Sequence, residues 1–230
     1  MKKILFYLTF LLLSAAVSLA QDEGTRYLES VAKAYEGLKD YTCDVKVHFD
    51  VEALKSPDME AKVYYKAPDK LKVESKKIFF FPREGGFFNP AMFRSQDFDI
   101  ILLERLTYDG GKAVKLKLIP QKAGKITHEI TLTIDTERNL IREMNISQFG
   151  GRVIKAAIEY GKFDTFQLPT RIGLNLDIPP QEPNESKEFD QFAQRGRRMT
   201  GKVDITYSKY KVNSGLSDEM FTEKESQKRR

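Results

Sequence analysis

The stretch Thr42-Cys43-Asp44-Val45-Lys46-Val47-His48-Phe49-Asp50-Val51 alternates polar and apolar side chains without a break. Successive side chains of a β-strand point to opposite faces of a sheet, so a period of two is typical of a half-buried strand. This strand is the clearest in the chain. It indicates a protein built on a sheet that has one apolar and one charged side.

The residues before this strand have a helical period instead. Leu28, Val31, Tyr35 and Leu38 follow one another at spacings of three and four residues, with charged residues between them. The spacing predicts an amphipathic helix from Thr25 to Leu38, with Thr25 as its N-cap. A helix this short is marginal in water, so its apolar face should lie on the sheet.

Further alternating segments follow, separated by turns rich in Gly, Pro, Asp and Asn. Together with the first strand they predict about ten antiparallel strands, the third with Leu71 and Val73 facing inward. The fold class expected is mainly β (α+β). The sheet would be curved or barrel-like, and closed by the N-terminal helix and one short internal helix. The later strands are expected at residues 59–66, 71–73, 98–108, 112–119, 128–135, 140–148, 153–160, 171–178 and 203–207.

An aromatic window at residues 78–93 interrupts the alternation and holds six of the sixteen phenylalanines. It divides into a strand end, a turn whose flexible hinge is Gly85-Gly86, and a short helix. Asn is a favoured N-cap and Pro is favoured at the first helical position, so Asn89-Pro90 predicts a helix that runs to about Gln96.

The first twenty residues have the features of a secretory signal: Met1-Lys2-Lys3, an apolar run from Ile4 to Leu13, and the small-residue site Ser18-Leu19-Ala20. Residues 21–230 would then form one exported domain, with a long polar loop at 179–199. Loss of two lysines with the signal lowers the formal charge from +5 to +3, which is too small to indicate nucleic-acid binding.

The sequence lacks the usual signatures of catalysis. His48 and His128 are the only histidines and lie in alternating strands, and Cys43 lies on an apolar strand face. There is no Gly-x-Ser-x-Gly motif and no phosphate loop, and the glycine pairs fall where hairpin turns are expected. We therefore expect no enzyme, no metal and no cofactor.

Alternation alone also fits an outer-membrane barrel, whose apolar side faces lipid. The leading amphipathic helix, which needs a core to pack on, and the charged segment Gln227-Lys228-Arg229-Arg230 argue against that alternative.

The segment Val63-Tyr64-Tyr65-Lys66-Ala67-Pro68-Asp69-Lys70-Leu71-Lys72-Val73 resembles the strand, proline turn and strand of periplasmic lipoprotein carriers of the LolA type and of their LolB and RseB-like relatives. Later segments resemble the same family in the same order, at residues 115–120, 130–135, 168–172 and 210–221. The chain departs from these carriers in having no tryptophan, and in having Ala67 where they place an arginine before the turn proline.

The resemblance implies an open, strongly curved antiparallel sheet, a half-barrel wrapped around helices, in the periplasm of a Gram-negative-type envelope. It also implies a monomeric carrier of acylated lipoproteins or lipids, which would exchange cargo with inner- and outer-membrane transfer partners. An apolar cavity between sheet and helices would hold the acyl chains. Gly85, Gly86, Asn89 and Pro90 would form the hinge and start of a lid. The expected lining residues are Val45, Val47, Phe49, Tyr65, Phe79, Phe81, Phe88, Met92 and Phe93.

Two alternatives remain open from the sequence. The aromatic side chains could simply fill the core, since phenylalanine is usually buried. The protein could also be an RseB-like envelope-stress sensor or protein-interaction module without carrier activity, which would be marked by a persistent exposed apolar patch or strand edge.

Overall fold

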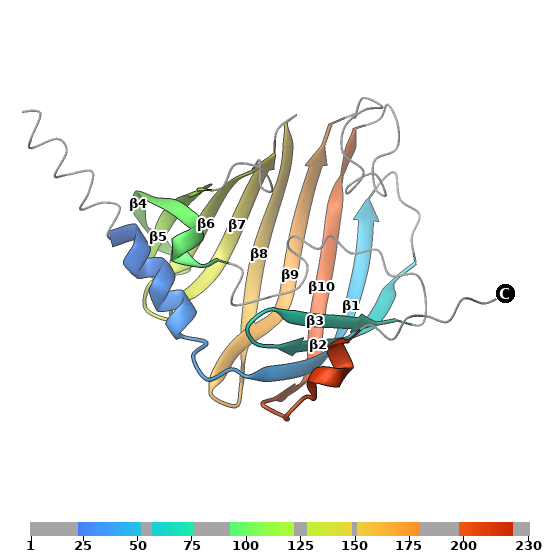
Figure 1. Ribbon diagram of the computed structural model, residues 1–230. Coiled ribbons are helices and arrows are strands. Elements are labelled where there is room, and N and C mark those ends of the chain that lie inside the picture. The colour runs from blue at the N-terminus through green and yellow to red at the C-terminus, as the bar shows by residue number, and fades with distance from the viewer. Residues whose placement is uncertain are drawn as a thin grey trace, which may run out of the picture. The chain divides into compact units, whose positions relative to one another are not determined.

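The computed structural model describes residues 23–51, 57–75, 93–121, 128–148, 151–179 and 198–222. The described chain contains one α-helix, at residues 23–33, two 3₁₀ turns and ten strands (Figure 1). The turns are η2 (Ser95–Asp97) and η3 (Asp218–Phe221). The strands are β1 (Asp40–Val51), β2 (Met59–Lys66), β3 (Lys70–Glu74), β4 (Phe98–Tyr108), β5 (Gly111–Pro120), β6 (His128–Asp135), β7 (Leu140–Gln148), β8 (Arg152–Phe163), β9 (Phe166–Ile178) and β10 (Met199–Val212).

All ten strands belong to one sheet, in the order β3-β2-β1-β10-β9-β8-β7-β6-β5-β4. Most neighbours in this order are also neighbours in sequence, and the strand pairs whose register is known are antiparallel. The exception is β1, which pairs with β10 and so joins the two ends of the domain. Because β3 and β4 end the order, the sheet is open, which confirms the expected open antiparallel sheet of about ten strands.

The chain divides into two compact units. The first comprises Met1–Ala34 and Phe93–Val153, and its described part holds the helix, η2 and strands β4 to β7. The second comprises Tyr35–Met92 and Ile154–Arg230, and it holds β1 to β3, nearly all of β8, β9, β10 and η3.

Strand β1 has the two faces that its sequence predicts. Val45 and Val47 are 2% and 0% exposed, whereas Lys46 between them and His48 after them are exposed. The same alternation continues in β2 and in β10, its neighbours on either side. The second unit therefore has an apolar inner face across these strands and a charged outer face.

A β-bulge changes which side chains of β10 face inward. Thr42 pairs with Lys211 but Asp44 pairs with Ser208, so Cys43 lies opposite two residues of β10. Lys209 absorbs the extra residue in a left-handed conformation, with φ of 53°. Bulges of this kind shift the two-residue period by one. Tyr210 consequently packs inward against aromatic rings. Simple alternation from the inward-facing Tyr207 would have placed Tyr210 on the outer face.

The helix differs from its expected bounds. Residues 23 and 24 are already helical, so Thr25 lies inside the helix and is not its N-cap, and the helix ends at residue 33. A turn follows at 34–37, where Gly37 has φ of +88°, a conformation that glycine adopts without strain. Tyr35 and Leu38 therefore belong to the turn and the approach to β1, although both are buried as predicted.

The start of the helix packs closely on β4 within the first unit. A Cβ atom on Gly24 would come within 2.9 Å of Cγ2 of Ile100, so only glycine allows this approach. On the same turn, Glu23 accepts hydrogen bonds from Nη2 of Arg105 at 2.6 Å. These tertiary contacts explain why the helix begins earlier than its sequence pattern suggests.

The internal helix expected from Pro90 to Gln96 lies largely outside the described residues. In its described part, Phe93 and Arg94 are not helical, and only the 3₁₀ turn η2 follows, at Ser95–Asp97. Arg94 is extended and forms an ion pair with Asp97 at 3.0 Å. The turn η2 therefore overlaps only the last two residues of the expected helix.

Leu71 is 41% exposed, although the alternation predicts it to be inward. Its direction is correct, because Leu71 lies opposite the buried Tyr65 on the same face. The expected burial is wrong because β3 ends the strand order, and no strand of the described residues lies beyond it to cover the side chain.

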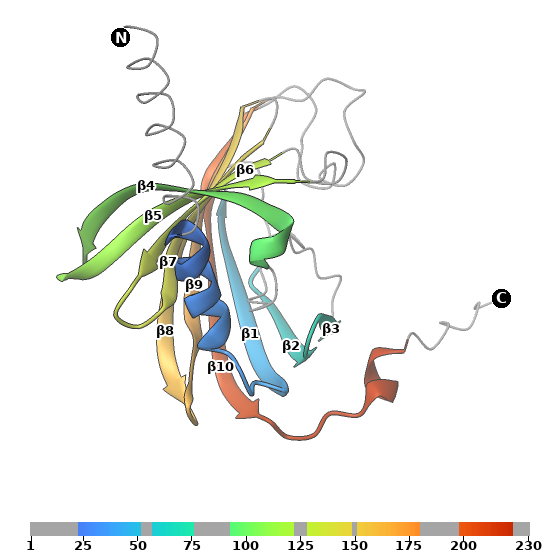
Figure 2. The ribbon, with the colours of Figure 1, turned by 60° about the vertical axis from the view of Figure 1, so that its left-hand side comes forward.

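The segment that follows β10 is fastened to the start of β1, beside which β10 ends (Figure 2). Asp40 is only 3% exposed, and its carboxylate accepts hydrogen bonds from the backbone N–H groups of Ser214, Gly215 and Leu216. Asn213 completes this fastening: its Oδ1 accepts from Lys39 N at 2.7 Å, and its Nδ2 donates to the Gly37 carbonyl at 3.0 Å. A buried carboxylate is tolerated here because the backbone donors replace its water shell.

We expect Asp40→Asn to destabilise the protein by about 2–3 kcal/mol, because an amide offers one acceptor oxygen to several buried N–H donors. Urea unfolding monitored by circular dichroism measures the change. Asp50→Asn, at an exposed position of the same strand, is the control and should change stability by less than about 0.5 kcal/mol. Equal effects of the two variants would contradict the role assigned to Asp40.

Gly201→Ala should destabilise the β1–β10 pair by about 1–3 kcal/mol, because a Cβ there would lie 2.5 Å from the Asp50 carbonyl oxygen and 2.7 Å from Val51 Cα. Gly173→Ala on β9 is the matched control, since its Cβ would meet nothing closer than Asp204 Oδ1 at 3.7 Å. Thermal unfolding of both variants distinguishes crowding from the general cost of replacing a strand glycine.

Candidate functional site

The inner face of the second unit is a continuous apolar surface. Four of the nine predicted lining residues lie on it: Val45, Val47 and Phe49 on β1, and Tyr65 on β2. Their exposed fractions are 2%, 0%, 8% and 2%. The face continues onto the neighbouring strands through Val203, Ile205 and Tyr207 of β10 and Ile172 and Leu174 of β9, all of them buried.

The near-zero exposure of Val45 and Val47 has a direct consequence. Water does not reach these side chains, so they are packed against other atoms in this conformation. A ligand could contact them only after the atoms that cover them have moved. The face is suited to an apolar ligand by its chemistry, and access to it requires a conformational change.

Phe93 is the fifth predicted lining residue within the described chain. It lies just before η2, and its ring is 6.3 Å from that of Phe98 on β4, between ring centroids. The remaining predicted residues lie outside the described part of the chain, and their role stays a prediction. They are the lining residues Phe79, Phe81, Phe88 and Met92 and the hinge residues Gly85, Gly86, Asn89 and Pro90.

Tyrosine rings border this face at the start of β1. Tyr41 stacks on Tyr65 with centroids 5.0 Å apart and meets the edge of Tyr210 at 5.5 Å. Two of the hydroxyls donate to backbone carbonyls, Tyr65 to Pro68 at 3.1 Å and Tyr210 to Pro169 at 2.8 Å. Burial raises the pKa of Tyr65 to about 12, so the rings stay neutral and behave as apolar surface with a satisfied polar tip.

Cys43 lies beside these rings and is 1% exposed. Burial raises the pKa of its thiol to about 12, so it remains protonated at neutral pH. A thiol needs to be ionised and accessible to act as a nucleophile, and Cys43 is neither. Among the described residues, no group of three or more His, Cys, Asp or Glu side chains is placed to hold a metal ion.

Lys66 precedes Ala67, the position where the family resemblance leads one to expect arginine. Its Nζ donates to the Leu216 carbonyl at 2.7 Å and pairs with Asp218 at 2.7 Å, and Lys70 pairs with the same carboxylate at 2.9 Å. The two lysines lower the pKa of Asp218 to about 2. Lys66 is thus engaged in fastening η3 to the β2–β3 turn.

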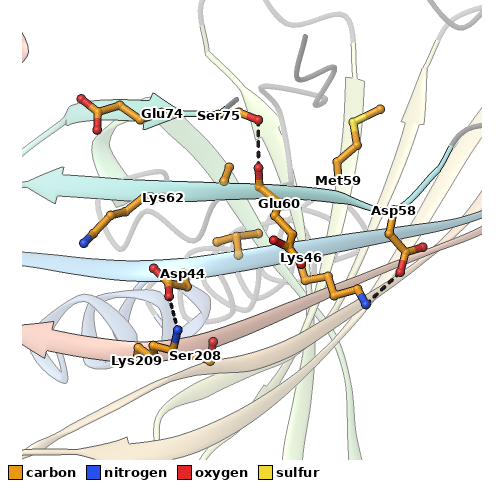
Figure 3. A pocket seen from close by; sticks show the side chains of 12 residues that line it. Asp44, Lys46, Asp58, Met59, Glu60, Lys62, Glu74, Ser75, Ser208 and Lys209 are labelled. Atoms are coloured by element: carbon orange, nitrogen blue, oxygen red, sulfur yellow. Dashed lines mark hydrogen bonds and ion pairs between the residues drawn. The ribbon is translucent and has the colours of Figure 1, made fainter. Parts of the chain in front are cut away.

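The outer face of β1, β2, β3 and β10 holds a hollow of about 850 Å³, which we call the charged hollow (Figure 3). It contains three lysines and four carboxylates, contributed by strands that are far apart in sequence. Sequence reasoning assigned these side chains to a solvated face and missed the hollow. Its lining residues are Asp44, Val45, Lys46, Asp58, Met59, Glu60, Ala61, Lys62, Glu74, Ser75, Ser208 and Lys209.

Several charges of the hollow neutralise one another. Asp58 accepts from Lys46 at 2.9 Å and contacts Nδ1 of His48 at 2.7 Å, and Lys209 pairs with Asp44 at 2.9 Å. Hydrogen bonds from Lys46 and His48 lower the pKa of Asp58, and the bond to Asp58 raises the pKa of His48. His48 is exposed, and its partner is the carboxylate of Asp58, just before β2.

Comparison with known proteins gives structural relatives only. No protein-family model and no curated sequence matches the chain. Within the described residues, no helix has the length and apolar character needed to cross a bilayer.

Three solved structures share the fold over most of the chain. A LolA superfamily protein from Nitrosomonas europaea is 15% identical, with a TM-score of 0.56 over 87% of this chain and 97% of its own. A DUF1329 family protein from Desulfovibrio piger is 12% identical, with a TM-score of 0.61 over 88% and 97%. A domain assigned to the outer membrane lipoprotein-sorting proteins of Vibrio parahaemolyticus is 11% identical, with a TM-score of 0.55 over 87% and 97%. The chain has the fold of these LolA-like proteins.

Proposed function

We propose that this protein is a periplasmic carrier that holds the acyl chains of lipoproteins or other lipids against the inner face of its sheet. The observation that carries the proposal is the unbroken apolar face of β1, β2, β10 and β9, which occurs on a fold shared with a LolA superfamily protein. The signal-like sequence at residues 1–20 supports the location.

The physical basis is the removal of methylene groups from water. Each buried methylene contributes about 0.8 kcal/mol, so a long acyl chain can bind tightly without specific polar contacts. A face lined by valine, isoleucine and aromatic side chains supplies that environment and selects for chain character more than for headgroup. The proposal involves no catalysis and no cofactor.

Opening is the step that such a carrier must control. Since Val45 and Val47 are covered, binding must be coupled to displacement of the residues over them. We assign this role to a lid that contains Phe88, Met92 and Phe93, with Gly85-Gly86 as its hinge. The cost of opening would let transfer partners at the inner and outer membranes determine when cargo enters and leaves.

The first measurement is native mass spectrometry of protein purified from the periplasm, followed by lipid extraction. We expect a bound acylated molecule, and saturable binding of a fluorescent fatty acid by the delipidated protein. Recovery of protein without any acylated ligand, together with no fatty-acid binding, would falsify the carrier proposal.

The variant Phe93→Glu tests whether Phe93 belongs to a lid or to a packed core. Phe93 is only partly buried, so as a lid residue its replacement should abolish fatty-acid binding and cost less than about 1.5 kcal/mol of stability. As a core residue it should cost several kcal/mol, because a charge would be buried without a partner. Phe221→Glu in η3, another partly buried phenylalanine, is the control and should leave binding unchanged.

A second candidate function, that of a protein-interaction module, is favoured by one observation. Ile101, Leu103 and Ile119 are 43%, 49% and 39% exposed and lie on β4 and β5, in a region of otherwise alternating charge. The register places Ile101 opposite Lys117 and Ile119 opposite Asp99, so these apolar side chains stand among charges. Clustered exposed apolar side chains of this kind often mark a docking surface.

Site-specific cross-linking tests this candidate. A photoreactive residue at Leu103 should give one discrete adduct in cells, which the double change Ile101→Lys and Ile119→Lys removes while lipid recovery is unchanged. The same photoreactive residue at Thr107, an exposed position further along β4, is the control. No adduct at Leu103, or an equal adduct at Thr107, would contradict a docking role.

A further inference from the structure

The charged hollow is built by cross-strand register on the outer face of the second unit. Asp44 of β1 lies opposite Ser208 of β10 on one side and Lys62 of β2 on the other, and Lys62 lies opposite Glu74 of β3. In the next row, Lys46 lies opposite Glu60. The outer face therefore carries alternating charges in both directions, and Figure 3 shows these side chains on the neighbouring strands.

Most of these charges already have a partner. Lys209 pairs with Asp44, and Lys46 pairs with Asp58. Glu74 accepts from the hydroxyl of Tyr64 at 2.9 Å and from Lys72 at 2.8 Å.

Two charges of opposite sign are left over. Within the part of the chain that the structure describes, neither the carboxylate of Glu60 nor the ammonium of Lys62 takes part in an ion pair; Lys62 only lies 5.9 Å from the ring centre of Tyr64. Both side chains are exposed and lie on the same face of β2, two residues apart, which separates their Cα atoms by roughly 6.5 Å. Glu60 acts electrostatically on Lys46 and Lys209, and Lys62 acts on Glu74, but these partners form their direct ion pairs with other side chains. The carboxylate of Glu60 and the ammonium of Lys62 therefore keep hydrogen-bonding groups available to a ligand.

We propose that the charged hollow binds a zwitterion of the phosphoethanolamine type, with the ammonium at Glu60 and the phosphate at Lys62. The hydroxyl of Ser208, on the same outer face, adds a hydrogen-bonding group to the lining. A volume of about 850 Å³ accommodates such a group together with its glycerol. The ligand is either a free soluble compound or the headgroup of a membrane lipid.

This site is separate from the acyl-chain site. Val45 and Val47 point to the inner face, whereas Glu60 and Lys62 point to the outer face of the same sheet. The inference therefore does not rest on the proposed carrier function, and either can fail without the other.

Titration of isotopically labelled protein with glycerophosphoethanolamine, followed by NMR, tests the inference. We expect saturable shifts of Glu60, Lys62 and Ser208, with weaker binding of glycerophosphate and of ethanolamine alone. Glu60→Gln and Lys62→Gln should each weaken binding roughly five- to tenfold. The controls are Lys202→Gln and Glu36→Gln, exposed positions outside the hollow, which should bind as the wild type does.

Binding to lipid vesicles distinguishes a membrane-lipid headgroup from a free soluble zwitterion as the ligand. Binding to phosphatidylethanolamine vesicles that is stronger than to phosphatidylglycerol vesicles, and that is lost in Glu60→Gln, identifies a lipid headgroup; binding of the soluble probe alone identifies a free zwitterion. Glycerophosphate binding equal to that of glycerophosphoethanolamine would overturn the zwitterion assignment. So would the absence of any shift with the soluble probe together with no preference among vesicles.

Discussion

The pairing of β1 with β10 is the contact on which the rest of the fold depends. It joins residues 41–51 to residues 201–212. The strands β1 and β10 are therefore third and fourth in the strand order and do not lie at its edges. Closing so long a loop costs conformational entropy that only extensive contacts repay. The structure supplies them twice: through the ladder itself, and through the Asp40 carboxylate, which holds the backbone beyond β10.

One consequence of this pairing is that a single strand serves two surfaces. The odd-numbered residues of β1 after the bulge face the apolar side, and the even-numbered residues face the charged outer side, where Asp44 and Lys46 line the charged hollow. A register slip by one residue would exchange the two sets, placing Lys46 in the core and Val47 in water. The close approach at Gly201, where a Cβ would touch the backbone of Asp50, further restricts the register.

The sequence predicts the strands well because alternation is a local property. The β4–β5 hairpin is a good example: Asp109 and Gly110 both have positive φ, 49° and 78°, as the two-residue loop of such a hairpin requires. Features that depend on distant partners were not predictable. Tyr210 faces inward because of a bulge opposite Cys43, and Leu71 is exposed because β3 ends the order of the described strands.

The candidate sites show the same division. The inner positions of Val45, Val47, Phe49 and Tyr65 follow from period two, whereas the charged hollow exists only once register brings β10, β1, β2 and β3 together. Likewise, the sequence shows Lys66 next to Ala67 but cannot show that its ammonium is bound to a carbonyl 150 residues away.

The engagement of Lys66 bears on how this fold could open. An arginine before the turn proline would offer five donors in a rigid fork, whereas lysine offers one flexible ammonium. Here that ammonium, with Lys70, holds Asp218 of η3, whose side chain is 65% exposed. Exposed ion pairs contribute little net stability, since water competes for both partners. The β2–β3 turn is thus held by ion pairs that cost little free energy to break. The packed tyrosine rings next to it cost more free energy to separate. Any opening of the apolar face would therefore start from the turn.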